Sequence, residues 1–386
     1  MDGYKQFGNM IIDENMLLFV SNADIFPALY SADLLNNKIE CFGEVPWDNF
    51  FDENVLLGKI EDVVIIAPRW HRRKFLKYDI KHATFQSIIL EQEVWTNDFS
   101  ISAFSNVVQF GNSLFFIGNK NGLIVEYMKE SDQFYIHNII FPKELSKEDL
   151  NFFWSSAYLI ENILYLPAVK GGLCKINLID FHMVYINNIQ DYQSFSMSLI
   201  DNQFWIMPYY GNKIIIYDLE SEKFTFIEIP VKGKEMPFMT AVDFGKEILL
   251  IPMENEKIFA IRKSTYEILE KQNFKLSKLK KNQIQRQFVA IYRDKTGNTY
   301  LQRNDSYELW IFNKIGTFKK MSFFVQFKNI KEIFKNSKAI KKGFWIENTN
   351  IGINCMIKIL KDSKYIEQIR RNDCGLKIWD FIKGEN

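Results

Sequence analysis

One phrase recurs along the chain, and this repeat limits the possible folds more than any other feature. It consists of an apolar strand, a short polar break, a second strand often followed by an acidic residue, a turn and a third strand, with its clearest copy at 203–230. A repeated unit of this size is typical of solenoids and propellers. The residues that end the first strand of successive copies lie 41 to 51 positions apart: Ser21, Pro68, Gly118, Pro167, Pro208, Pro252, Arg303 and Glu347.

A further short strand and a tight turn precede each copy, so the unit has four strands, A to D. Turn pairs such as Glu14-Asn15, Gly111-Asn112 and Asp201-Asn202 suit hairpins that need positive φ. Proline lacks an N–H and therefore suits the end of strand B. A four-stranded unit cannot bury its faces alone, but radially stacked units bury each other. The sequence therefore predicts an all-β fold, a single β-propeller of four-stranded antiparallel blades.

Eight copies favour eight blades, and seven is the alternative if the weak first or last copy merely caps the ring. One domain, 1–386, holds all of them. Asp373 is a suitable N-cap for a short C-terminal helix in the tail 371–386, which we expect to pack against the ring. The predicted blades lie near 7–44, 58–90, 104–140, 154–189, 194–230, 239–270, 288–324 and 334–370.

This pattern resembles bacterial β-propellers of the kelch-like and WD-repeat-like kind over roughly residues 7–370. Kelch units usually carry a Gly-Gly pair, which occurs here at Gly171-Gly172 alone. The Trp-Asp ending of WD repeats does not recur at the ends of the copies, and Trp379-Asp380 lies outside the repeat. The resemblance therefore implies a fold, and it assigns no functional residue.

Composition argues against several classes of function. The 48 basic and 47 acidic residues create no field that would attract nucleic acid. No run of eighteen apolar residues suggests a membrane span, and the N-terminus does not resemble a signal peptide, so we expect a cytoplasmic bacterial protein. The cysteines are far apart and the histidines lack metal-ligand spacing, so we expect buried thiols, no metal and no cofactor. These residues are Cys41, Cys174, Cys355, Cys374, His71, His82, His137 and His182.

Long and chemically varied loops fall in one class of position. In propellers the B–C loops and the D–A connections gather on one face around the channel mouth, and here they are longer than the A–B and C–D turns. Many carry aromatic rings, which offer contact area at low entropy cost and suit a peptide or protein partner. The alternative is that each ring fills a gap between blades. Candidates of this kind are Trp95, Trp154 and Phe238.

Two B–C loops carry the sharpest local features. In the first, two arginines beside an imidazole can grip a carboxylate or phosphate, unless they pair with acidic neighbours in a solvated loop. In the second, two tyrosines lie near a lysine, with packing into the adjacent blade as the alternative. The residues of the two loops are Trp70, His71, Arg72 and Arg73, then Tyr209, Tyr210 and Lys213.

These features favour a non-enzymatic binding module or scaffold that holds a peptide or protein partner on the loop face. The alternative is an enzyme for a small polar or sugar-like substrate at the channel mouth, with His71 and its arginines polarising it and Glu254 or Asp305 as acid or base. A third hypothesis is a structural subunit that uses the blade rims. The other histidines fall in C–D turns or in a D strand, away from the loop face, and this placement disfavours a two-histidine active site.

Overall fold

The computed structural model describes the blades and most of the short turns between their strands. The described residues are 7–21, 28–36, 38–46, 55–68, 74–90, 104–118, 122–145, 157–168, 171–186, 192–231, 236–253, 257–274, 276, 287–303, 308–322 and 324–325.

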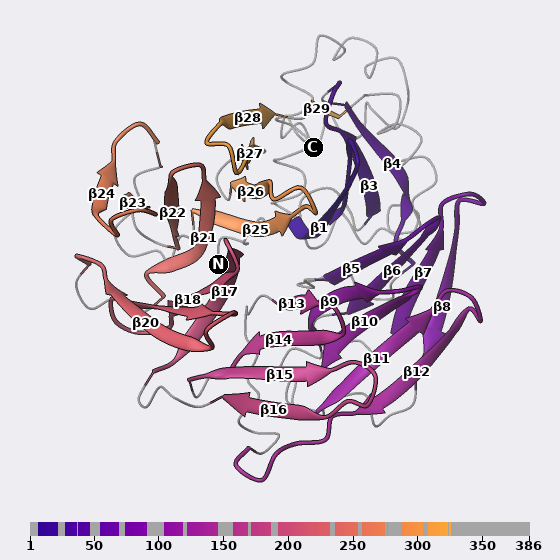
Figure 1. Cartoon of the computed structure of the whole chain (residues 1–386). Coiled ribbons are helices and arrows are strands. Elements are labelled where there is room, and N and C mark those ends of the chain that lie inside the picture. The colour runs from indigo at the N-terminus through magenta and orange to yellow at the C-terminus, as the bar shows by residue number, and fades with distance from the viewer. Residues whose placement is uncertain are drawn as a thin grey trace, which may run out of the picture.

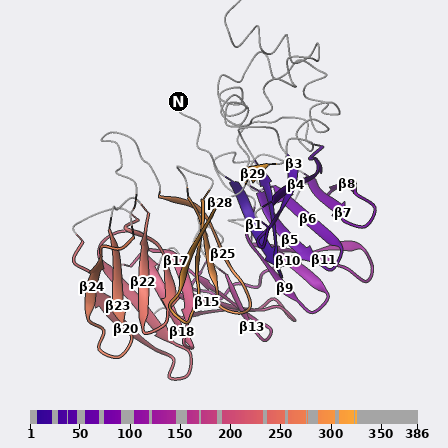
Figure 2. The same cartoon turned by 90° about the horizontal axis from the view of Figure 1, so that it is seen from above.

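The described strands form seven antiparallel blades that surround a common centre (Figure 1), and Figure 2 shows the same blades from above. In each blade the strands pair in chain order, so the first strand is innermost and the fourth is at the rim. Blade 1 is β1–β4 (Phe7–Asp13, Met16–Ser21, Ala28–Asp33, Lys38–Glu44) and blade 2 is β5–β8 (Val55–Ile60, Val63–Pro68, Lys74–Asp79, Thr84–Ile89). Blade 3 is β9–β12 (Phe104–Phe110, Ser113–Gly118, Leu123–Met128, Gln133–Asn138) and blade 4 is β13–β16 (Tyr158–Ile160, Ile163–Pro167, Leu173–Asn177, Met183–Ile186). Blade 5 is β17–β20 (Ser194–Ile200, Gln203–Pro208, Lys213–Asp218, Lys223–Glu228), blade 6 is β21–β24 (Phe238–Phe244, Glu247–Pro252, Ile258–Arg262, Ile268–Lys271) and blade 7 is β25–β28 (Phe288–Arg293, Thr299–Arg303, Glu308–Phe312, Phe318–Ser322).

The strand chemistry follows the position of each strand in its blade. The second strands β6 and β10 are buried at every residue, because a neighbouring blade covers each of their faces. The outer strands β8 and β20 alternate between exposed and half-buried side chains, as expected at a rim. The A–B turns have the positive φ that their sequences predicted, for example at Glu14, Gly111 and Asp201. Prolines end β6, β14, β18 and β22.

The prediction of eight blades is wrong, because blade 7 packs directly against blade 1. The Tyr292 hydroxyl on β25 donates to the Ile12 carbonyl on β1 at 3.0 Å. One apolar cluster also joins Tyr30 of blade 1 to Leu309 and Met321 of blade 7. The copies of a repeat can be counted in a sequence, but the number of blades in a ring depends on the rotation between neighbouring blades. That rotation is set by packing. The seven-bladed alternative matches the described strands.

The chain continues from blade 7 to the rim of blade 1. There β29 (Phe324–Val325) pairs in parallel with β4, so blade 1 carries a fifth strand. The predicted eighth blade, 334–370, and the predicted helical tail, 371–386, lie outside the described residues. The residues that are described form no helix, and thus none long and apolar enough to cross a membrane.

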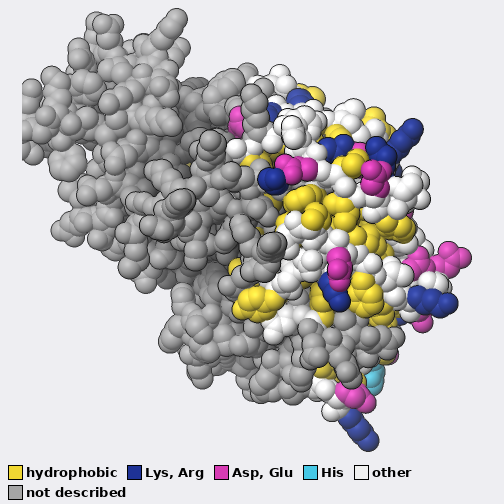
Figure 3. Space-filling model, turned by 90° about the vertical axis from the view of Figure 1, so that its left-hand side faces the viewer, with side chains coloured by type: hydrophobic (Ala, Val, Ile, Leu, Met, Phe, Trp, Pro, Cys, Tyr) yellow, Lys and Arg dark blue, Asp and Glu magenta, His cyan; other side chains and the backbone are white. Residues whose placement is uncertain are grey.

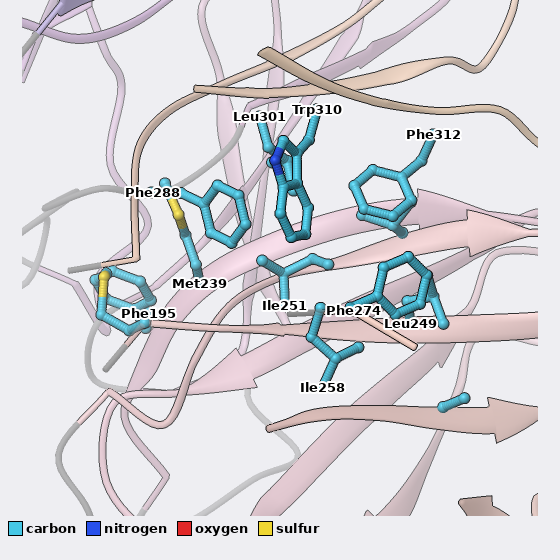
Figure 4. Close-up of a cluster of buried hydrophobic side chains, with 13 residues drawn as sticks. Phe195, Met239, Leu249, Ile251, Ile258, Phe274, Phe288, Leu301, Trp310 and Phe312 are labelled. Carbon is cyan, nitrogen blue, oxygen red and sulfur yellow. The ribbon is translucent and has the colours of Figure 1, made fainter. Parts of the chain in front are cut away.

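Apolar faces hold neighbouring blades together. Figure 4 shows the cluster between blades 6 and 7, where Leu249 and Ile251 of β22 face Phe288 and Trp310. Trp310 is fully buried, and the Phe288 ring meets it edge-on with the ring centroids 5.3 Å apart. Burying one large apolar side chain contributes about 2 kcal/mol. Such interfaces therefore position the strand ends that carry the loops.

The face that carries the A–B and C–D turns is linked from blade to blade by ion pairs. Exposed pairs of this kind contribute at most about 1 kcal/mol each, so their main effect is to align neighbouring blades. The pKa of the Asp62 carboxyl, for example, is lowered because Lys129 donates a hydrogen bond to it. The pairs are Lys59–Asp13 (2.6 Å), Lys77–Asp132 (2.5 Å), Lys129–Asp62 (2.8 Å), Lys175–Glu222 (2.6 Å) and Lys263–Asp201 (2.5 Å).

Candidate functional site

In blades 5 and 6 the residue that follows the proline of the second strand fixes the start of the B–C loop. The Tyr209 amide donates to the Gln193 carbonyl at 2.7 Å, next to the start of β17. The Tyr209 carbonyl accepts from the Met236 amide at 2.6 Å, near the start of β21. One residue thus links the entry of its own blade to the entry of the next. The corresponding bonds one blade on join Met253 to Pro237 (3.3 Å) and Gln287 to Met253 (2.9 Å).

This anchored loop brings three of the predicted binding residues together. The Tyr209 ring packs edge-on against Phe195, with centroids 6.3 Å apart, and against Tyr210 at 4.7 Å. Tyr210 is 57 % exposed, whereas Tyr209 is packed against the cluster between blades 6 and 7. The Lys213 side chain is exposed, with its Nζ 3.5 Å from the Glu228 carboxylate. An exposed ring therefore packs against a half-buried one, three positions before Lys213 in the chain.

The other predicted loop-face residues are placed differently. Phe238, the first residue of β21, is fully buried, and its ring meets Phe259 with centroids 6.4 Å apart. It packs between blades 5 and 6 and presents no surface to a partner, which is the gap-filling alternative. The remaining candidates lie outside the described residues: Trp70, His71, Arg72, Arg73, Trp95 and Trp154.

The described histidines lie away from the centre of the ring. His82 is in a C–D turn, with its Nδ1 2.7 Å from Asp79 Oδ2. On the outer strand β12, His137 has its Nε2 2.8 Å from Glu126 Oε2. His182 lies in the C–D turn of blade 4. Within the described ranges no group of three His, Cys, Asp or Glu side chains is arranged to hold a metal ion.

Cys174, on β15, is a buried free thiol, as the sequence predicted. Burial raises the pKa of this thiol to about 12, so the residue stays protonated near neutral pH and packs as a small apolar side chain. Cys174 is therefore part of the core and no nucleophile.

The innermost strands carry a polar cluster that was not predicted from the sequence. Arg293, the last residue of β25, donates from Nη1 to the Tyr158 hydroxyl of β13 at 2.6 Å. Its Nη2 donates to Ser198 Oγ of β17 and to the Ala241 carbonyl of β21, both at 2.8 Å, and to Thr240 Oγ1. One guanidinium thus spans four blades. The available signal was the polar alternation of the inner strand β17, whose side chains at 194, 196 and 198 are serines.

The loop lies at one end of the inner strands, whereas Arg293 starts at the other end and its guanidinium reaches Thr240 and Ala241 near the middle of β21. β25 begins after a D–A connection and ends at the A–B turn, and Arg293 is at that end. Tyr209 follows a B strand and therefore lies at the other end. The propeller thus has two separate candidate sites.

Comparisons with known proteins support the fold and nothing more specific. No family model matches the chain, and no curated protein matches it. Virginiamycin B lyase from Staphylococcus aureus is similar in structure with a TM-score of 0.54 and 12% identity, covering 84% of this chain and 97% of the lyase. The extracellular domain of a one-component system from B. thetaiotaomicron gives 0.52 and 12%, covering 80% of this chain and 38% of that one. The Cps50 (Swd1) β-propeller domain of Myceliophteria thermophila gives 0.54 and 8%, covering 80% and 97%. At such identities the likeness establishes a β-propeller, and neither a kelch nor a WD family is shown.

Proposed function

We propose that this chain is a non-catalytic binding module that holds a peptide or protein partner on the face formed by its B–C loops and D–A connections. The supporting observation is Tyr210, an aromatic side chain exposed on a loop whose backbone is hydrogen-bonded to two blades. A rigid support lowers the entropy cost of binding, because the loop does not have to be ordered by its partner. Tyrosine also combines apolar area with a polar tip, which is typical of residues that dominate interfaces.

Lys213, three positions after Tyr210, suggests which chemistry a partner would need. Lys213 is exposed, and its pairing with Glu228 at 3.5 Å is loose and screened by solvent. A partner segment with an apolar side chain and a nearby carboxylate would contact both the ring and the ammonium group. The predicted arginines of the 69–73 loop, Arg72 and Arg73, would add to the same preference.

A matched pair of tyrosines tests this proposal. Tyr210→Ala removes the ring from the loop face, and Tyr266→Ala removes a tyrosine that is 47 % exposed on a C–D turn of the opposite face. Affinity purification from the native host with quantitative mass spectrometry identifies partners, and titration with the purified partner gives its Kd. We expect Tyr210→Ala to weaken binding about 30-fold, as at an interface hot spot, and Tyr266→Ala to leave it unchanged.

Equal recovery of every partner by both variants and by the unmodified chain would contradict this assignment. A double variant, Trp70→Ala with Arg72→Ala, extends the test to the predicted B–C loop of blade 2.

The blade rims offer less support for a structural-subunit role. Figure 3 shows the side of the molecule at the left of Figure 1, where the outer strands β20 and β24 lie. Hydrophobic side chains there are interspersed with lysine, arginine and acidic ones. Isolated exposed apolar residues such as Phe226, which is 53 % exposed, are normal on a protein surface.

A further inference from the structure

The geometry points to a second binding site, between the inner strands of blades 4 to 7, that takes the carboxylate of a small organic anion. Arg293 and Tyr158 are the residues that would contact it. They come from inner strands of blades 7 and 4, which are 135 positions apart in the chain. None of these contacts involves the loop that carries Tyr210, so the site is independent of the function proposed above.

No described residue neutralises the charge of Arg293. Its described partners are the hydroxyls of Tyr158, Ser198 and Thr240 and the carbonyl of Ala241, and all of them are neutral. No carboxylate among the described residues forms an ion pair with it. Removing a guanidinium from water without a counter-ion costs several kcal/mol, so a half-buried arginine in neutral surroundings favours an anion.

Three acidic side chains of the inner strands and the adjacent turn are bonded to other groups. The adjacent Asp294 accepts hydrogen bonds within its own turn, from Thr296, from Asn298 and from the Tyr300 hydroxyl. Two acids within other inner strands pair with lysines: Asp13 with Lys59 at 2.6 Å, and Asp243 with Lys263 at 2.8 Å.

Hydrogen-bond donors remain at this position. Nη2 of Arg293 is used three times, whereas Nη1 makes one bond and Nε makes none with the described residues. The Tyr158 oxygen accepts from Nη1, so its own hydrogen points elsewhere, and no described residue accepts it. The N–H groups of a guanidinium and a neighbouring O–H together match the two oxygens of a carboxylate.

The surrounding turns indicate a small ligand with little charge. The A–B turns of blades 6 and 7 expose Lys246 and Lys295, whereas those of blades 1, 2 and 4 expose Glu14, Glu61 and Glu161 on the same face. The negative charge of these glutamates repels polyanions such as nucleic acids or polyphosphates over distances of about 10 Å at ordinary ionic strength. A single carboxylate is the class of anion that best satisfies both the cation and these glutamates.

Acetate is the probe for the test, because it carries the carboxylate and almost nothing else. The thermal midpoint of the full chain is measured as sodium acetate replaces sodium chloride at constant ionic strength. A ligand that binds the folded state alone raises the midpoint along a saturating curve, which yields an apparent Kd. Sodium phosphate, exchanged in the same way, forms a second arm.

Three variants locate the effect. We expect Arg293→Met to abolish the acetate response and Tyr158→Phe, which removes one donor to a charged group, to weaken binding about tenfold. Lys295→Met removes the same charge from an exposed side chain two residues on, and its response should equal that of the unmodified chain. If Arg293→Met does not fold, Tyr158→Phe and Lys295→Met still decide the question.

Two results would overturn the inference. One is an acetate curve no different from the chloride curve, or an equal response from Arg293→Met. The other is a phosphate response that depends on Arg293 and exceeds the acetate response, which would rule out a carboxylate site. Neither result bears on Tyr210, because the partner of the loop face is measured separately.

Discussion

The inner strands of blades 2 and 3 meet differently from those of blades 4 to 7. On β5, Gly58 has no side chain, and a Cβ placed there would lie 2.9 Å from Leu114 Cδ1 and 3.1 Å from Val107 Cγ2. On the other side of the ring the contacts are polar: Ser196 Oγ donates to the Met239 carbonyl at 2.7 Å, and Arg293 spans four blades. The inner strands are thus joined by close apolar packing in one half and by directional hydrogen bonds in the other, although apolar clusters also lie between the blades of the second half. The first kind of contact depends on shape, and the second fixes register and leaves polar groups available to a ligand.

The largest effect is expected where the apolar half is tightest. Gly58→Leu forces a side chain against Leu114 and Val107, and it should lower the free energy of unfolding by about 3 kcal/mol through overpacking. Urea denaturation measures this change. Gly111→Asn is the matched control, because Gly111 has a φ of +56° with nothing within 4 Å, and asparagine tolerates that conformation. Comparable losses in both variants would show that the two inner strands are not closely packed.

The hydrogen bond that joins blade 7 to blade 1 should contribute less to the free energy of unfolding than the packing at Gly58. Tyr292→Phe keeps the ring but removes the hydrogen bond to the Ile12 carbonyl, so we expect a loss of about 1 kcal/mol in the free energy of unfolding. Tyr135→Phe, at the rim of blade 3, alters an exposed hydroxyl and should have no measurable effect. If the two variants unfold at the same urea concentration, the hydroxyl contributes nothing to closure.

Acid should weaken the turn that holds Arg293 in place. Burial raises the pKa of Asp294, but hydrogen bonds from Thr296, Asn298 and Tyr300 outweigh this effect and hold it below the ordinary 3.8. Its contribution to stability is therefore complete above pH 3.8 and is lost as the pH falls through the lowered value. Asp294→Asn should cost about 1 kcal/mol at pH 7 and reduce the loss of stability on acidification, measured as the unfolding free energy against pH. An unchanged acid limb would argue against this turn as a source of pH dependence.

The smallest effect on stability is expected at the most connected residue. Arg293→Met removes four hydrogen bonds, each with a net contribution of about 1 kcal/mol, and this loss destabilises the fold. The variant also no longer has to bury an unpaired charge, which costs several kcal/mol, so the two effects oppose each other. We expect the free energy of unfolding in chloride buffer to change by less than about 1 kcal/mol. A loss of about 3 kcal/mol or more would instead identify Arg293 as a brace between blades.

The fold could be predicted from local signals, whereas its closure could not. The turn pairs, the prolines and the apolar B strands report on single blades, and the structure has them where the sequence placed them. The blade count was wrong because it depends on the contact between Ile12 and Tyr292, which are 280 positions apart. Tyr209, Tyr210 and Lys213 lie within five positions of each other and form a pattern that can be read locally, whereas the partners of Arg293 come from three other blades and leave no local pattern.

The parallel pairing of β29 with β4 has a consequence for the order in which the chain is made. Blade 1 emerges first from the ribosome, yet its inner strand has to wait for blade 7 and its outer edge for β29. Until then the edge of β4 exposes unpaired backbone groups, which are a template for strand addition by another chain. Residues beyond 320 thus cover the β4 edge of blade 1, the first of the seven blades to be synthesised. A truncated product that lacks them keeps this edge open and is prone to aggregate.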